Sequence, residues 1–147
     1  MKNKSLFSPG NIIHPFIVID RFLNPFNQHT VIDLDNKSCT ISCTRRASLA
    51  LELLQQPLIV EMQLYFSCVV KKRVLIHHGT QVFQTSPVAD KFSIAFHTVE
   101  AASCDPEEFA RHFPAKRILD SEAARKMHPR VLKLDFKQGE WQGEFQI

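Results

Sequence analysis

Glycine is scarce in this sequence, with only four glycines among 147 residues. Loops that cradle a phosphate depend on glycine, because only a backbone without side chains comes close enough to the ligand. The sequence also contains no Walker loop, dinucleotide fingerprint, HExxH or G-x-S-x-G motif. Because these motifs are absent, the sequence indicates no known reaction, and we predict no catalytic residue.

Long apolar runs are also missing. None approaches the ~18 residues that a membrane-spanning helix needs. Lys2 and Lys4 resemble the start of an export signal, but Ser8-Pro9-Gly10 follows at once and no small-residue cleavage site comes after it. We therefore expect a cytoplasmic protein that has no membrane partner.

Paired cysteines of the CxxC type are absent, although the chain has four cysteines: Cys39, Cys43, Cys68 and Cys104. Cys39 and Cys43 are four residues apart on one predicted strand, which separates them by roughly 13 Å. That distance is too long for a disulfide or for a metal shared by these two alone. In the cytoplasm thiols stay reduced. We expect buried, reduced cysteines, no metal and no cofactor.

Polar aromatic residues are few: twelve Phe stand beside one Tyr and one Trp. Phe has no polar group, so most of these rings belong in a core. Hydrophobic residues make up 44% of the chain, and the formal net charge is only +3. The length fits one domain. We predict a single domain over residues 1–147, with a flexible segment at residues 1–10.

Two β-hairpins are predicted from alternating apolar and polar residues. Residues 29–35 and 38–44 alternate on either side of a turn at Asp35-Asn36-Lys37, and residues 131–136 and 140–147 do the same around Gly139. We therefore expect two antiparallel strand pairs, one near each end of the chain.

Helices are predicted at several places. Residues 46–56 carry apolar side chains at helical spacing between a possible N-cap, Thr44, and a helix-ending Pro57. The apolar residues 12–22 are too few for periodicity to separate a strand from a short helix. Capping signals and prolines predict two further short helices, over residues 105–112 and 121–127.

The stretch from Leu58 to His78 is the longest β-prone segment. Its apolar residues alternate with polar ones over the first half. One straight strand of this length would span roughly 65–70 Å, whereas a domain of this size has a radius of gyration of only ~15 Å. The sequence has no Gly or Pro here for a tight turn, so we predict a bulge or bend at Lys71–Arg73.

The same stretch contains the residues that we select as candidate binding residues. They are basic or imidazole side chains, namely Lys71, Lys72, Arg73, His77 and His78. Neighbouring strand residues point to opposite faces, so His77 and His78 cannot chelate one metal as a pair. The basic step Lys71-Lys72-Arg73 becomes an anion site if it meets the other basic doublets of the chain, namely Arg45-Arg46, Lys116-Arg117 and Arg125-Lys126. Otherwise these are separate solvated positions.

The predicted strands cluster rather than alternate with helices, which favours an α+β fold. We predict a mostly antiparallel sheet of about five to seven strands with two or three helices on one face.

Three functional hypotheses follow. The first is a non-catalytic interaction or ligand-binding module, with a homodimer through an exposed strand edge as one possible form. The second is an enzyme whose site is assembled from scattered Cys, His and Asp residues. The third is binding of an acidic partner through the basic doublets. Nucleic acid is the less favoured partner, since the net charge is small and no RNA-binding signature is present.

Overall fold

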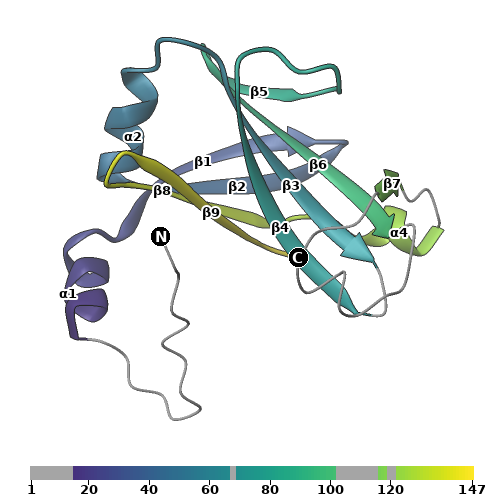
Figure 1. Cartoon of the computed structure of the whole chain (residues 1–147), viewed down its shortest axis with the longest axis horizontal. Helices are drawn as coiled ribbons and strands as arrows, with labels where there is room; N and C mark the ends of the chain where they lie inside the picture. The colour runs from purple at the N-terminus through teal and green to yellow at the C-terminus, as the bar shows by residue number, and fades with distance from the viewer. Residues whose placement is uncertain (1–14, 67–68, 102–115, 119–121) are drawn as a thin grey trace.

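The computed structural model describes residues 15–66, 69–101, 116–118 and 122–147. Within these residues it contains two sheets and three helices (Figure 1). The first sheet is formed by β1 (Phe26–Leu34), β2 (Lys37–Thr44), β8 (Val131–Lys137) and β9 (Glu140–Gln146). The second is formed by β3 (Leu58–Phe66), β4 (Val70–His78), β5 (Ser86–Ala89), β6 (Phe92–Ala101) and β7 (Lys116–Ile118). The helices are α1 (Pro15–Leu23), α2 (Arg45–Glu52) and α4 (Glu122–Lys126).

The strand order is β1-β2-β8-β9 in the first sheet and β4-β3-β6-β5 in the second, where β7 also pairs with β6. The pairs β2–β8 and β3–β6 are parallel, and the other strand pairs are antiparallel. The predicted α+β class is confirmed. The prediction of one sheet of five to seven strands is wrong, because the chain leaves the first sheet after β2 and returns to it only at β8.

The hydrophobic core lies between the two sheets. The first sheet contributes Ile41 and Leu134, the second contributes Met62 and Ile94, and α2 adds Ala47; all five are almost fully buried. Burial of each large apolar side chain favours folding by ~1.5–3 kcal/mol. The core therefore depends on both sheets together, and neither sheet has another apolar layer of this size among the described residues.

The first predicted hairpin is present as β1 and β2. Asp35 and Asn36 occupy the turn with φ values of 52° and 65°, a conformation that Asp and Asn tolerate better than most residues. The predicted N-cap of α2 is also confirmed, since the Thr44 hydroxyl accepts a hydrogen bond from the Ala47 amide at 3.2 Å. The helix itself ends at Glu52, earlier than predicted.

The long stretch from Leu58 forms a hairpin of two strands. Phe66 of β3 pairs with Val70 of β4, so the chain reverses between these two residues. The predicted bulge or bend at Lys71–Arg73 is wrong, because these residues pair in regular register inside β4. A connection of three residues does not need the Gly-dependent two-residue turn, so the lack of Gly and Pro did not prevent a reversal.

The apolar segment near the N-terminus is helical where it is described. α1 has no buried residue, and each of its six large apolar side chains is at least half exposed: Phe16, Ile17, Val18, Ile19, Phe22 and Leu23. α1 contacts α2 and β8 through Asp20 but does not cover a sheet face in Figure 1, so the helices do not share one sheet face as predicted. No helix in the described part of the chain is both long and apolar enough to cross a membrane.

The other two predicted helices have different outcomes. The one predicted over residues 121–127 is present as α4. The one predicted over residues 105–112 lies outside the described residues, and so does the N-terminal segment 1–10 that we expect to be flexible.

A polar network around Asp135 joins α1, α2 and β8. Arg46 donates to both oxygens of the Asp135 carboxylate at 2.8 and 2.7 Å, and the Thr44 hydroxyl donates to the same group at 2.7 Å. Arg46 also donates to both oxygens of Asp20 on α1 at 3.0 and 3.1 Å. The hydrogen bonds from Arg46 are the main reason why the pKa of Asp135 falls from 3.8 to about 2.

Replacing Asp135 by Asn should test this network. A lowered pKa means that the ionised carboxylate stabilises the folded state above about pH 4 and that this contribution is lost as the pH falls to about 2. We expect Asp135→Asn to lower the free energy of unfolding at neutral pH by about 1–3 kcal/mol and to weaken its pH dependence between 4 and 2. Urea denaturation over this pH range measures both effects. The exposed Asp90→Asn is the control, and equal pH profiles for the two variants would contradict the network's role.

Candidate ligand-binding groove

Strands β4 and β9 lie side by side where the two sheets meet. Gly143 of β9 makes this approach possible, since a Cβ atom placed there would be only 2.8 Å from Cγ1 of Val74 on β4. Real Cβ atoms do not come this close to another carbon, so any other residue at position 143 would separate the strands. We call this line of contact the β4–β9 seam.

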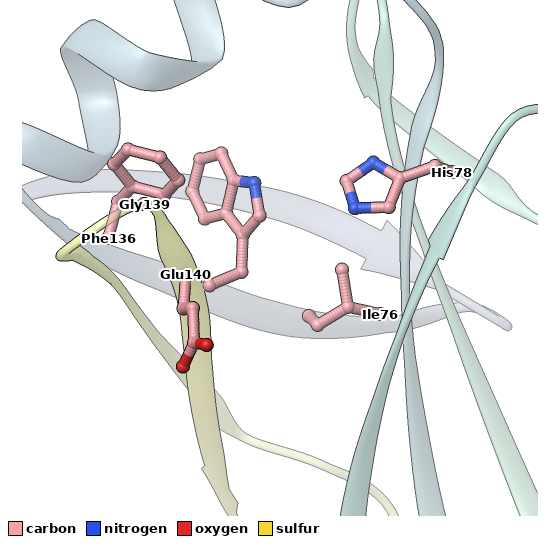
Figure 2. Close-up of a pocket in the computed structure, with 6 residues that line it drawn as sticks. Ile76, His78, Phe136, Gly139 and Glu140 are labelled. Atoms are coloured by element: carbon pink, nitrogen blue, oxygen red, sulfur yellow. The ribbon is translucent and has the colours of Figure 1, made fainter.

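A groove of about 520 Å³ lies on the seam, toward the β8–β9 turn. Figure 2 shows Ile76 and His78 of β4 on one side and Phe136 and Glu140 of the hairpin on the other. The groove lining is completed by Gly139 and Trp141. Pockets for small ligands have volumes of ~300–1,000 Å³. The groove is therefore large enough for a small molecule.

The hairpin turn fixes the aromatic wall of this groove. Gln138 and Gly139 have φ values of 52° and 77°, which produces a tight turn. Phe136 and Trp141 are consequently direct cross-strand neighbours, with ring centroids 4.8 Å apart and ring planes tilted by 53°. Such aromatic pairs stabilise a hairpin. Here the pair also supplies a preformed apolar surface that faces β4.

The polar groups of the groove lie near its exposed rim. Both Glu140 and His78 are exposed. Figure 2 shows the Glu140 carboxylate pointing away from the Phe136 ring, so it attracts a positively charged ligand through its charge at the rim, whereas the π-faces of the wall attract a cation inside the groove. The groove therefore combines an apolar wall with one negative charge at its edge.

A second, smaller groove of about 250 Å³ lies farther along the seam. Lys72 and Glu144 contribute its charged side chains, and Val74, Gly143 and Phe145 belong to its lining. The Lys72 ammonium is 5.9 Å from the centre of the Phe145 ring. Because Val74 and Gly143 touch between the two grooves, each groove is a separate space.

A buried polar cluster lies on the opposite face of β3 and β4. The Gln63 amide donates to both carboxylate oxygens of Glu61 at 2.7 and 3.1 Å. Nε2 of His77 is 3.6 Å and Nδ1 of His97 is 3.9 Å from this carboxylate. The Phe83 ring lies edge-on to both imidazoles, with centroid distances of 5.5 and 5.2 Å. Two imidazoles thus flank one buried carboxylate.

The five candidate residues predicted from the sequence are divided between these places. His78 lines the larger groove and Lys72 the smaller one. His77 joins the Glu61 cluster, so the two histidines do point to opposite faces as predicted. Lys71 and Arg73 share the face of His77 by strand alternation. Lys71, Lys72 and Arg73 therefore do not form one binding site.

Several residues of these sites were not predicted. Trp141, Phe136 and Glu140 line the groove, and Glu61 and His97 form the buried cluster. The alternation Trp141-x-Gly143-x-Phe145 was visible in the sequence, but the position of β4 beside it was not. A carboxylate in the middle of a nine-residue apolar strand was the available signal for Glu61.

The described cysteines lie in the core. Cys39 and Cys43 are buried, and burial raises the pKa of Cys43 to about 11. Both thiols therefore stay protonated near neutral pH and are poor nucleophiles. Cys68 and Cys104 are outside the described residues. In the part of the chain that the structure describes, no three His, Cys, Asp or Glu side chains are placed to hold a metal ion.

No protein-family model, curated protein or solved structure matches this chain.

Replacing Gly143 by Ala should test the close contact of the seam. The new methyl group would overlap Val74, which has few rotamers and cannot move away easily. We expect Gly143→Ala to lower the free energy of unfolding by about 1–3 kcal/mol. Chemical denaturation of Gly143→Ala, Val74→Ala and the double variant measures the coupling between the two sites. The double variant should be more stable than the sum of the single effects predicts, and simple additivity would contradict the contact.

Proposed function

We propose that this protein is a non-catalytic ligand-binding module and that the larger groove of the β4–β9 seam is its binding site. The observation that supports this is the aromatic pair Phe136–Trp141, which faces Ile76 and His78 across a space of about 520 Å³. A tight turn and a sheet hold these residues in place, so little order has to be gained when a ligand binds.

The lining favours one chemical class of ligand. An aromatic wall beside Ile76 favours a ring or another flat apolar group. The Glu140 carboxylate at the rim favours a positively charged group, and no Lys or Arg side chain lines this groove. We therefore propose a small organic cation that carries an apolar or aromatic ring, such as an aromatic amine.

The buried Glu61 cluster supports a ligand site less well. Only 5% of Glu61 and 1% of Gln63 is exposed, so a ligand has little access to them. Gln63 already donates to both carboxylate oxygens. The cluster does suit a structural role, because a buried carboxylate needs such hydrogen bonds to stay in a sheet.

The two alternative functions remain proposals with less support. An enzyme assembled from Cys, His and Asp would have to work without Cys39 and Cys43, which lie protonated in the core. An acidic partner would meet separate basic residues, because Lys72 faces the seam and Arg46 is already paired with Asp20 and Asp135. A cytoplasmic location also remains a proposal.

The charge of Glu140 provides a direct test. We expect benzylamine to bind with a dissociation constant near ~1 mM and about threefold to fivefold more tightly than the uncharged benzyl alcohol, as a partly exposed cation–π and carboxylate contact contributes about 0.5–1 kcal/mol. Glu140→Gln should reduce this preference, because the amide has no negative charge and only the cation–π contribution of the aromatic rings is left. Calorimetric titration of both probes against both proteins measures it.

Glu144→Gln is the matched control. Glu144 lies on the same strand and is exposed, but it lines the smaller groove and pairs with Lys133. This variant should keep the preference for benzylamine. Equal affinity of the wild type for the two probes, or the same loss in both variants, would contradict the proposed site.

A further inference from the structure

The edge strands of the two described sheets are protected to different degrees, and the three-residue β7 is too short to pair extensively. β4 carries Lys71, Lys72 and Arg73, and β9 lies against β4 along the seam. β5 is only four residues long, contains Pro87 and has an irregular register beside it. Short length, proline, bulges and lysine are the usual devices that prevent an edge strand from pairing with another chain.

β1 has almost none of these devices. It is nine residues long, and its sequence FNQHTVIDL contains no Lys, Arg, Pro or Gly. Its register irregularity lies at the start, between Phe26 and Gln28, so the strand is regular from Gln28 to Leu34. Among the described strands it pairs only with β2, and β5 approaches it without pairing.

The middle of β1 is open to solvent. Residues 27–31 are all exposed, and Val31 is 65% exposed. Every second residue of an edge strand directs its N–H and C=O groups away from the sheet. β1 therefore offers a regular row of hydrogen-bonding groups around an exposed apolar side chain, at the edge of the first sheet (Figure 1).

The order of the side chains along β1 favours a second copy of this chain as the partner. An antiparallel pairing of two β1 strands about a twofold axis at Val31 places each residue opposite its mirror position in the sequence. His29 is then opposite Asp33 of the partner subunit, and Val31 is opposite Val31 of the partner subunit. All three residues lie on one sheet face, because they are two apart along the strand. Opposite charges and apolar residues in such cross-strand positions are favourable.

We propose that β1 is a homodimerisation edge, at which two copies of this chain pair antiparallel in the register centred on Val31. The pairing joins the two first sheets into one continuous sheet and satisfies the edge N–H and C=O groups of both copies. The interface is isologous, since the same surface is used twice. It lies on a different edge from the β4–β9 seam and does not depend on the ligand proposed above.

A charge exchange tests the register. His29→Asp places Asp opposite Asp33 of the partner subunit, whereas the double variant His29→Asp/Asp33→His restores opposite charges. Both variants lose the hydrogen bond between His29 and Ser42, so a difference between them reports the cross-strand pair. We expect His29→Asp to raise the dimer dissociation constant about tenfold, since like charges would meet twice, and the double variant to restore it within about threefold.

Sedimentation velocity over a concentration series, at about pH 6 where histidine ordinarily carries charge, measures these constants on the full chain. Far-UV circular dichroism confirms that each variant is folded. Val31→Lys should abolish dimerisation, because lysine at the centre of an edge strand opposes pairing. Val70→Lys is the matched control: Val70 is 58% exposed at the start of β4, and its replacement should leave the dimer intact. A wild type that stays monomeric, or a double variant as weak as His29→Asp, would overturn the proposal.

Discussion

The contact between Val74 and Gly143 is the constraint on which the proposed site depends. It joins two strands that belong to different sheets, and it is possible only because residue 143 has no side chain. On one side of this contact the strands separate around Phe136, Trp141, Ile76 and His78, which leaves the larger groove. The volume and composition of the groove therefore follow from the close contact of the Gly143 backbone with the Val74 side chain and from the tight turn between β8 and β9.

Two polar features support this architecture without taking part in the groove. The Asp135 carboxylate holds Arg46 and Thr44 at the junction of α2 with the first sheet. On the outer face of the second sheet, Gln63 satisfies the buried Glu61 carboxylate. Both are buried charges with hydrogen bonds, as the low polarity of a protein interior requires. The Asp135 network holds β8, which carries Phe136 of the groove wall, against α2.

Local features of the sequence predicted much of the secondary structure. The Asp35-Asn36 turn, the Thr44 N-cap and the C-terminal hairpin depend on neighbouring residues, and all three are present. Non-local pairing was not predictable in the same way. The parallel pair β2–β8 divides the strands into two sheets, and no residue near either strand indicates it. The reversal before Val70 was missed because its connection contains no Gly or Pro.

The candidate site was only partly predictable for the same reason. Strand alternation correctly separated His77 from His78, but Trp141 and Glu140 reach His78 only through the contact between sheets. Trp141 is the only tryptophan of the chain, so its indole N–H gives one identifiable NMR signal. Heteronuclear NMR during a benzylamine titration tests directly whether the larger groove binds this ligand. We expect this signal and the backbone amides of His78 and Glu140 to shift together and saturate. Saturable shifts elsewhere, with this indole signal unchanged, would contradict binding in this groove.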